Sequence, residues 1–508
     1  MNNFFENLVS INDAINSQVW GKGLYLLLAT GLLMTILNKA FQVSHLGHWI
    51  KETIGSLFNK NVSGHTKGKS ISQFQALCTA LAATIGVGNI AGVAAAITTG
   101  GPGAVFWMWV AAFLGMMTNY SENVLGIFYR RKNSDGEWSG GAMYYLQDGL
   151  GSKRGCKGIG KFLAVIFSIF CILASFGIGN MGQVNKIVVN FTSAFDISAL
   201  SSKVLYDDIT LYHLVIGLAL VALAALIILG GLKRIANFAE KVVPFMVVTF
   251  VLGSIVIIVK NADMILPALK QIFVTAFTPN AAWGGATGIT ISTVITQGCK
   301  RGVFSNEAGL GSSVMVHSSS NVKEPVRQGM WGIFEVFSDT MVVCTMTALV
   351  ILTSGVINLD SGAISSGITG DATLVAKAFY TVYGGLGEKF VSIAILLFAF
   401  TTVLGWSHYG SIAVEYLGGK TAVKIYKVIF VLMIISGALL TSSLAWDISD
   451  TFNGLMMIPN LIGVICLSGL VMKITKNYVD RKIHNLDIEP MLSYFPDIQK
   501  EAEKEIRK

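Results

Sequence analysis

The sequence predicts an all-α polytopic membrane protein with about eleven transmembrane helices. Of its 508 residues, 53% are hydrophobic and only 13% are charged, whereas soluble domains have roughly 25% charged residues. The chain also contains 54 glycines, and small residues let membrane helices pack closely. A water-soluble enzyme could not bury so much apolar surface, so the composition excludes that class.

Eleven apolar segments of bilayer-spanning length, roughly 20 residues each, are spaced along the chain. The residues before the first segment lack the basic region and the cleavage site of a signal peptide, so we expect a true first span. In chain order the predicted spans are Trp20 to Phe41, Ile71 to Thr98, Val105 to Tyr129, Phe162 to Val189, Leu211 to Leu229, Val242 to Val259, Gly285 to Val316, Met330 to Leu352, Phe390 to Tyr416, Val423 to Ser442 and Asn453 to Met472.

Lysine and arginine are distributed unevenly among the loops. Cytoplasmic loops of membrane proteins carry an excess of basic residues. If the N-terminus lies outside, 30 of the 37 basic residues fall on the cytoplasmic side. This predicts an extracellular N-terminus and a cytoplasmic C-terminus. It also accounts for the net charge of +8 without nucleic acid as a partner.

The second segment has glycines at its midpoint, Gly86 and Gly88. Interrupted helices indicate the binding site of a transporter. Unwinding here would free carbonyls from Ala82 to Ile85 for a cation or an ammonium group, and amides from Gly86 to Asn89 for a carboxylate. An amino acid carries both groups. Alternatively, the glycines, with Gly92, only allow close helix packing.

The seventh segment is also rich in glycine, so we expect a break between Gly285 and Gly298. It begins five segments after the second. This spacing is the one expected of two inverted five-helix repeats.

The fourth segment contains the pattern GxGxxG, from Gly177 to Gly182. It follows no predicted strand, so we exclude a nucleotide site. The amide of Gln183 needs a partner at this depth, either a substrate or another helix.

The ninth segment places Thr401 and Thr402 at mid-span, with Trp406 one turn later. Two threonine hydroxyls can complete an oxygen shell around a small cation such as sodium. Alternatively, they bond back to their own helix.

The acidic residues Glu335 and Asp339 lie four apart in the eighth segment. We expect gating or structural pairs, and a proton relay is the alternative. His45 and His48 lie at the end of a span and are expected to be interfacial. The six cysteines show no paired spacing, so we expect neither a disulfide nor a zinc site.

One run of sixteen residues, GGPGAVFWMWVAAFLG from Gly100 to Gly115, resembles the signature of the alanine or glycine:cation symporter family, the bacterial sodium:alanine symporters. Four other stretches resemble the same family. They are ATIGVGNIAGV from Ala83, GGAMYYL from Gly140, KRGVFSNEAGLGS from Lys300 and FTTVLGWSHYG from Phe400.

The resemblance implies a leucine-transporter-like fold, with inverted five-helix repeats and one extra N-terminal helix. Residues 1–70 would hold the extracellular N-terminus, the extra helix and a cytoplasmic loop, 71–260 the first repeat, 261–472 the second repeat and 473–508 a cytoplasmic tail. The implied sodium ligands are the carbonyls of Ala82, Ile85 and Phe398 and the hydroxyls of Thr401 and Thr402. The implied substrate-binding residues are Thr84, Gly86, Gly88, Asn89, Gln183, Thr290, Thr293 and Trp406.

The implied activity is symport of sodium and a small neutral amino acid, alanine or glycine, into the cell by alternating access. Sodium is then a co-transported ion, and the chain is not an enzyme. Its expected location is the bacterial plasma (inner) membrane, in contact with the lipid bilayer and with no required protein partner. The alternatives are proton coupling in the same fold or, in a different class, an ion channel or a membrane-embedded enzyme.

Overall fold

The computed structural model is almost entirely helical. It describes residues 2–57, 59, 64, 70–278, 290–364, 371–440 and 444–506. Within these residues the strands form two short antiparallel hairpins. They are β1 (Arg131–Lys132) with β2 (Trp138–Ser139), and β3 (Val204–Tyr206) with β4 (Ile209–Thr210).

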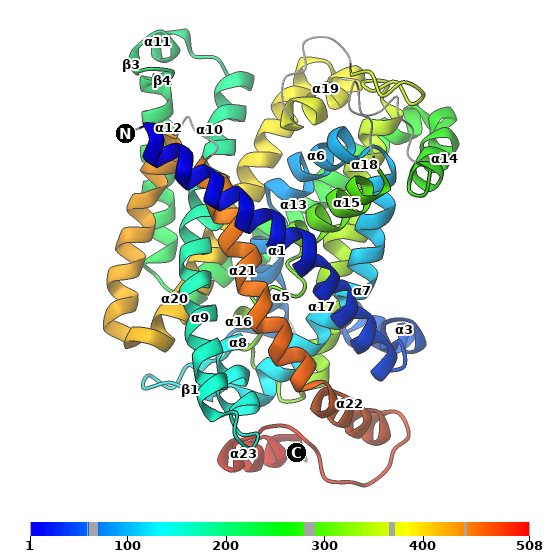
Figure 1. The fold of residues 1–508 in the computed structure, drawn as a ribbon, viewed down its shortest axis with the longest axis vertical. Coiled ribbons are helices and arrows are strands. Elements are labelled where there is room, and N and C mark those ends of the chain that lie inside the picture. The colour runs from blue at the N-terminus through cyan, green and yellow to red at the C-terminus, as the bar shows by residue number, and fades with distance from the viewer. Residues whose placement is uncertain are drawn as a thin grey trace.

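The N-terminal helix α1 runs obliquely across one face of the molecule, over α21 (Figure 1). The side-chain amide of Asn16 donates to Asp450 at 3.1 Å and to Thr451 at 2.9 Å, which fixes the crossing of the two helices. The helices before residue 70 are α1 (Asn2–Leu37), α2 (Phe41–Ser44), α3 (Leu46–Glu52) and η1 (Ile54–Ser56).

The next helices include the first broken one, which begins with a capping box. The amide of Gln75 donates to the Ser72 hydroxyl, and the Ser72 amide donates to the Gln75 side chain, so the first turn is well satisfied. The elements are α5 (Gln73–Thr84), η2 (Val87–Asn89), α6 (Ala91–Gly100), α7 (Gly103–Tyr129), α8 (Ala142–Tyr144), η3 (Tyr145–Leu150), α9 (Lys157–Phe176), η4 (Gly177–Met181), α10 (Gly182–Ala194), α11 (Ser198–Ser201), α12 (Leu211–Ile228) and α13 (Leu232–Lys260).

The remaining helices include a 54-residue element, α20, which is two helices joined at Gly419. Gly419 has φ 71°, a conformation that glycine adopts readily. The elements are η5 (Ala262–Met264), α14 (Ile265–Thr275), α15 (Ile291–Asn306), α16 (Val314–His317), α17 (Pro325–Val336), η7 (Phe337–Cys344), α18 (Thr345–Thr353), α19 (Asp371–Tyr383), α20 (Gly385–Ala438), α21 (Leu444–Cys466), α22 (Ser468–Lys482) and α23 (Pro496–Ile506).

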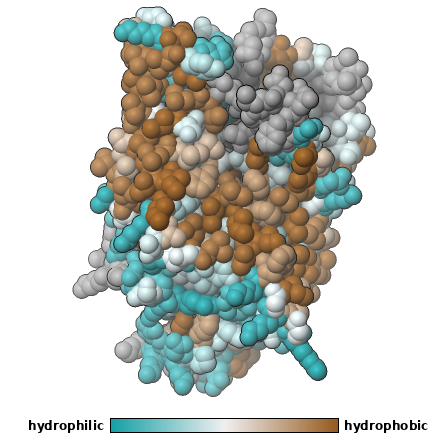
Figure 2. Space-filling model, turned by 60° about the vertical axis from the view of Figure 1, so that its left-hand side comes forward, coloured by the Kyte–Doolittle hydropathy of each residue, from teal (hydrophilic) through white to brown (hydrophobic). Residues whose placement is uncertain are grey.

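Seven helical stretches of the described chain are long and apolar enough to cross a membrane. One of them, α20, contains two predicted spans on either side of Gly419. The second and seventh predicted spans are divided into shorter helices, and α7 carries a polar run from Thr118 to Asn123. The second span within α20, the two divided spans and α7 are the four predicted segments that are absent from the seven long apolar helices. A broad hydrophobic band covers the face drawn in Figure 2, with hydrophilic residues gathered at its lower end.

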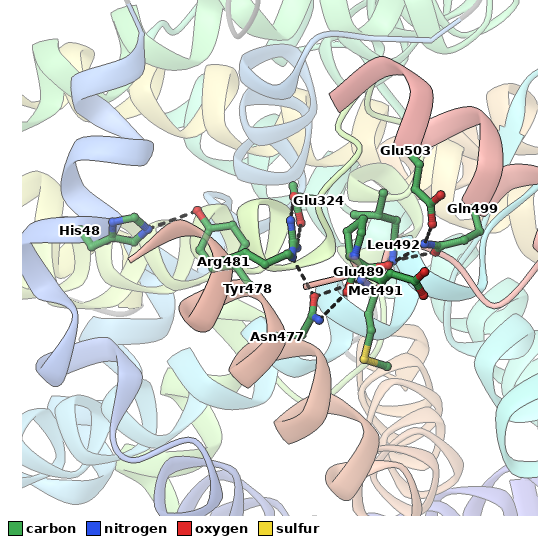
Figure 3. A network of polar contacts seen from close by, with 11 residues as sticks. His48, Glu324, Asn477, Tyr478, Arg481, Glu489, Met491, Leu492, Gln499 and Glu503 are labelled. Atoms are coloured by element: carbon green, nitrogen blue, oxygen red, sulfur yellow. Dashed lines mark hydrogen bonds and ion pairs between the residues drawn. The ribbon is translucent and has the colours of Figure 1, made fainter. Parts of the chain in front are cut away.

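The two ends of the chain lie at opposite ends of the molecule (Figure 1). The C-terminal tail returns to pack against the end that also carries α3 and the β1–β2 hairpin. Arg481 on α22 forms a bidentate ion pair with Glu324, at 2.8 Å for each nitrogen. The side-chain oxygen of Asn477 accepts a hydrogen bond from the backbone amide of Met491 (Figure 3). The C-terminal tail, residues 473–506, is therefore folded against the protein and ends in α23; we call it the C-terminal strap.

Candidate functional site

The second predicted span is a broken helix, as expected from its glycines. Helix α5 ends at Thr84, Ile85 and Gly86 are extended, and the chain becomes helical again through η2 and α6. The side chain of Asn89 closes the gap, because its oxygen accepts the Gly86 amide at 2.9 Å. The break therefore lies at the predicted residues.

Both glycines of the break are needed for close approach to other helices. A Cβ on Gly86 would lie 2.5 Å from the hydroxyl oxygen of Thr402 on α20. A Cβ on Gly88 would lie 3.2 Å from the ring of Phe304 on α15. The unwound segment thus contacts α20 on one side and α15 on the other.

The seventh predicted span is also broken, but later than predicted. Helix α15 is continuous from Ile291 to Asn306, and Glu307 then adopts the left-handed conformation with φ 56°. Gly309 and Gly311, also at positive φ, continue the turn toward α16. The break therefore lies beyond Gly298, and the part of the predicted range before residue 290 lies outside the described residues.

A small cavity of about 10 Å³, roughly the room that one water molecule needs, lies where the two broken helices meet η4, α10, α20 and α21. Its walls combine glycine and apolar surface with hydroxyl, amide, indole and carboxylate groups. The lining residues are Ala83, Thr84, Gly86, Gly88, Ile178, Gln183, Phe304, Glu307, Thr402, Trp406 and Asn453.

Five predicted substrate-binding residues are therefore brought together in this cavity: Thr84, Gly86, Gly88, Gln183 and Trp406. Asn89 lies behind the wall, where it donates to Asp339 at 2.7 Å. Gln183 accepts the Val87 amide at 3.3 Å, which ties the fourth span to the break in the second. A π-helical segment, η4, precedes Gln183, and such segments are frequent at functional sites.

The predicted residues Thr290 and Thr293 are not brought to the cavity. They lie at the start of α15, where Thr290 caps the helix by accepting the Thr293 amide; Thr290 is exposed and Thr293 is partly buried. The cavity is lined instead by Phe304 and Glu307, more than three helical turns further along the chain.

Glu307 is the carboxylate of the cavity, and the sequence predictions did not include it. It is buried, and its two oxygens accept from Trp406 Nε1 at 2.8 Å and from the Ser312 hydroxyl at 2.6 Å. Its signal in the sequence is the run Asn306-Glu307-Ala308-Gly309, an acid beside a glycine inside a membrane segment.

Asn453 on α21 is a second residue that the sequence did not reveal. It is 1% exposed, it lines the cavity, and its side-chain oxygen has no hydrogen-bond partner among the described residues. Buried polar atoms in proteins are normally paired, so this oxygen is available to a bound molecule.

The five predicted sodium ligands lie along the contact between α5 and α20. All five are buried. The two helices touch closely, because a Cβ on Gly405 would lie 2.5 Å from that of Ala83. The hydroxyls of Thr401 and Thr402 donate to the Phe398 carbonyl at 2.9 and 3.0 Å.

These hydrogen bonds within α20 leave the threonine oxygens free to bind a cation but occupy the Phe398 carbonyl. A hydroxyl that donates its hydrogen keeps its oxygen lone pairs for a cation, so both threonines remain usable. The Phe398 carbonyl already accepts two hydroxyl hydrogens, which makes it the most occupied oxygen of the predicted set. The ligand set itself stays a prediction.

The two acids of the eighth span have separate partners. Asp339 accepts from Asn89 and, at 2.8 Å each, from the hydroxyls of Ser305 and Thr340. It thereby joins the two broken helices on the side away from the cavity, which it does not line. Glu335 lies 2.9 Å from His317 Nε2. Both carboxylates are fully buried.

Comparison with known proteins places the chain in a family. The sodium:alanine symporter family matches residues 5–491. The chain belongs to the sodium:alanine symporter family. Members of this family are transporters, so the protein is a multi-pass membrane transporter and not an enzyme.

Two relatives are similar to the chain over nearly their whole length. The sodium/alanine symporter AgcS of Methanococcus maripaludis is 42% identical over 473 residues, which cover 93% of this chain and 97% of AgcS. An uncharacterized transporter of Haemophilus influenzae is 41% identical and is covered to 99% of its length.

Among solved structures, a sodium-coupled sialic acid symporter in a substrate-bound outward-open state has a TM-score of 0.51 at 14% sequence identity. The match covers 96% of this chain and 95% of that one. This likeness shows the fold. The predicted leucine-transporter-like architecture is thus confirmed for this sodium:alanine symporter family member.

Proposed function

We propose that the protein is a symporter that couples sodium to the uptake of a small neutral amino acid, alanine or glycine. The observation that carries this proposal is the cavity at the meeting point of two broken helices, which combines a carboxylate with amide and hydroxyl groups, among them the unpartnered oxygen of Asn453. The match to the sodium/alanine symporter AgcS supports the choice of ion and substrate.

The substrate is a zwitterion, and the cavity offers groups of both kinds. The carboxylate of Glu307 and the free oxygen of Asn453 attract the ammonium group. The side-chain nitrogen of Gln183 donates to the Ile178 carbonyl at 3.1 Å and keeps a second hydrogen for the carboxylate group. Trp406, Phe304 and the close contacts of Gly86 and Gly88 crowd the cavity, so it must widen to admit a substrate, and a short side chain requires the least widening.

Sodium binds between α5 and α20, at the carbonyls of Ala82 and Ile85 and the hydroxyls of Thr401 and Thr402, with Phe398 contributing its carbonyl. Its presence joins the broken helix to α20 and so completes the adjacent substrate cavity. The membrane potential adds about 2.3 kcal/mol per charge per 100 mV to the driving force.

The transport core comprises residues 71–260 and 261–472 as two inverted repeats, with 1–70 before it and 473–508 after it. The chain lies in the bacterial plasma membrane with its N-terminus outside. The supporting observation is that the basic segments near α3, β1, α22 and α23 gather at one end of the molecule (Figure 1).

A proton-coupled symporter of the same fold is the second candidate. The buried carboxylates Glu335 and Asp339 favour it, since Asp339 is joined to both broken helices through Asn89 and Ser305. In this case uptake would follow pH and ignore sodium.

The test is alanine uptake into liposomes that contain the purified protein. Accumulation driven by an inward sodium gradient, and lost when potassium replaces sodium at two pH values, supports sodium coupling. Uptake that persists without sodium and follows the proton gradient contradicts it.

The ligand assignment is tested in the same liposomes. We expect Thr401→Ala and Thr402→Ala to raise the half-saturating sodium concentration about tenfold, the scale of one lost contact to a charged group. Thr347→Ala is the matched control, because Thr347 is also buried and bonds back to its own helix at 3.2 Å but lies outside the cavity.

A further inference from the structure

A second, larger cavity lies toward the end of the molecule that carries the basic segments. It has a volume of about 300 Å³, and its walls come from the β1–β2 hairpin, the connection between α12 and α13, the residues after α16, and α20. It shares none of its lining residues with the candidate substrate cavity.

Helix α20 links this cavity to the predicted sodium site. His408 lines the cavity and lies seven residues after Thr401. Seven residues are about two helical turns, so His408 and Thr401 lie on the same face of α20, roughly 10 Å apart along its axis. Gly405, between them on this face, is the residue that contacts α5.

The ring of His408 is unusual because it is buried without a partner. Its side chain is 8% exposed, and among the described residues its Nε2 has no hydrogen-bond partner. A buried polar atom of this kind normally pairs with protein, water or a ligand. The residue is also one of the walls of the cavity.

Two hydroxyl oxygens lie in the same cavity. Ser411, one turn after His408, donates its hydrogen to the Ser407 carbonyl at 2.6 Å. Ser319, which follows α16, donates to the Met315 carbonyl at 3.4 Å. Both hydroxyls therefore keep oxygen lone pairs that can accept a further hydrogen bond, and such oxygens accept from an ammonium group.

The charges at this cavity disfavour a bare cation as its ligand. Lys233, Lys420 and Lys427 all line it. The negative charges of the two acids that line it are partly neutralised by Lys420, which lies 2.8 Å from Glu137 and 3.8 Å from Glu415. A ligand with one positive and one negative group fits these surroundings better than a lone sodium ion.

We propose that this cavity is a second binding site for the transported amino acid, occupied on the way to the cytoplasm. The Nε2–H of His408 donates to the carboxylate of the substrate, and the Ser411 and Ser319 oxygens accept from its ammonium group. The inference rests on the proposed function, because that function supplies the zwitterion.

The test compares the two sides of the membrane with right-side-out and inside-out vesicles. We expect His408→Phe, which keeps the ring and removes the nitrogens, to raise the KM for alanine on the cytoplasmic side about tenfold, the effect of one lost hydrogen bond to a charged group. The KM on the external side stays within about twofold. His484→Phe, in the exposed tail, is the control and changes neither value.

Equal KM values for His408→Phe and the wild type on the cytoplasmic side, or an equal rise on both sides, overturn the second site. If His408→Phe fails to reach the membrane, Ser411→Ala carries the same comparison. Wild-type vesicles with no sodium-driven alanine uptake contradict the proposed function, whereas normal wild-type uptake with an unchanged cytoplasmic KM contradicts only the second site.

Discussion

Trp406 and Glu307 join two distant parts of the transport core through one hydrogen bond, from indole Nε1 to the carboxylate at 2.8 Å. The indole comes from α20 and the carboxylate from the break after α15. Ser312 holds the other carboxylate oxygen at 2.6 Å. The acid is thereby aimed into the cavity with both oxygens fixed.

Replacing Trp406 by phenylalanine removes the donor and keeps most of the ring. The Glu307 oxygen is then buried without a partner, which costs about 1–3 kcal/mol. We expect the KM for alanine to rise about tenfold and thermal stability to fall, as measured by uptake and by unfolding in detergent.

Trp109→Phe is the matched control for this variant. Trp109 Nε1 also donates at 2.8 Å, to Thr345, but the residue does not line the cavity. It should lose stability with an unchanged KM. A similar KM for the two variants would show that the Trp406 bond has only a structural role.

Replacing Glu307 by glutamine tests the charge itself. The amide keeps the size of the side chain and can still accept from Trp406, while the attraction to an ammonium group is lost. We expect the KM for alanine to rise at least tenfold, since hydrogen bonds to charged groups contribute roughly 1.5–3 kcal/mol. Glu388→Gln, which breaks only the Lys377 pair on α19 and α20, should transport normally. An unchanged KM in Glu307→Gln would exclude a contact with the substrate ammonium.

The glycines of the first break give a graded series. Gly86→Ala places a methyl group 2.5 Å from the Thr402 oxygen, Gly88→Ala places one 3.2 Å from the Phe304 ring, and Gly92→Ala meets nothing within 4 Å. We therefore expect sodium-driven uptake to be abolished in the first variant, reduced in the second and normal in the third. Uptake measured at equal protein amounts in the liposomes checks the order, and a Gly92→Ala variant as inactive as Gly86→Ala would contradict it.

The sequence predicts the position of the first break but not that of the second, for a physical reason. The break at Gly86 and Gly88 is local, because two glycines cannot hold a helix against an available alternative. The second break depends on Glu307, whose left-handed backbone is supported by Ser312 and by Trp406, 99 residues away. Glycine content drew the prediction to the start of the segment instead.

Long-range packing also decides which polar residues reach the cavity. The sequence points to Gln183 because its amide interrupts an apolar segment at mid-span, whereas Thr84 and Trp406 follow from the resemblance to the family. Asn453 looks the same in the sequence as many interfacial asparagines, and only the position of α21 beside η4 brings it to the cavity. The fold class follows from composition and spacing, whereas the complete lining requires the assembled helices.

Thr290 and Thr293 provide a negative test of the site. They lie at the exposed start of α15, so Thr290→Ala and Thr293→Ala should leave the KM for alanine and the sodium dependence unchanged. Thr290→Ala should still lower stability by about 0.5–2 kcal/mol, because it removes a helix cap. A change in the KM for alanine without a change in stability would contradict this prediction and show that these residues contact the substrate.

The ion pair between Arg481 and Glu324 should dominate the attachment of the C-terminal strap (Figure 3). Both side chains are 9% exposed and meet through two contacts of 2.8 Å. Removing one partner leaves a buried charge, so we expect Arg481→Gln to lower the free energy of unfolding by about 3 kcal/mol. Lys132→Gln breaks the pair with Glu501, whose side chains are 43% and 49% exposed, and should cost less than about 1 kcal/mol. Thermal unfolding in detergent at low and high salt measures both. Equal losses would contradict the prediction, because water and salt screen only the exposed pair effectively.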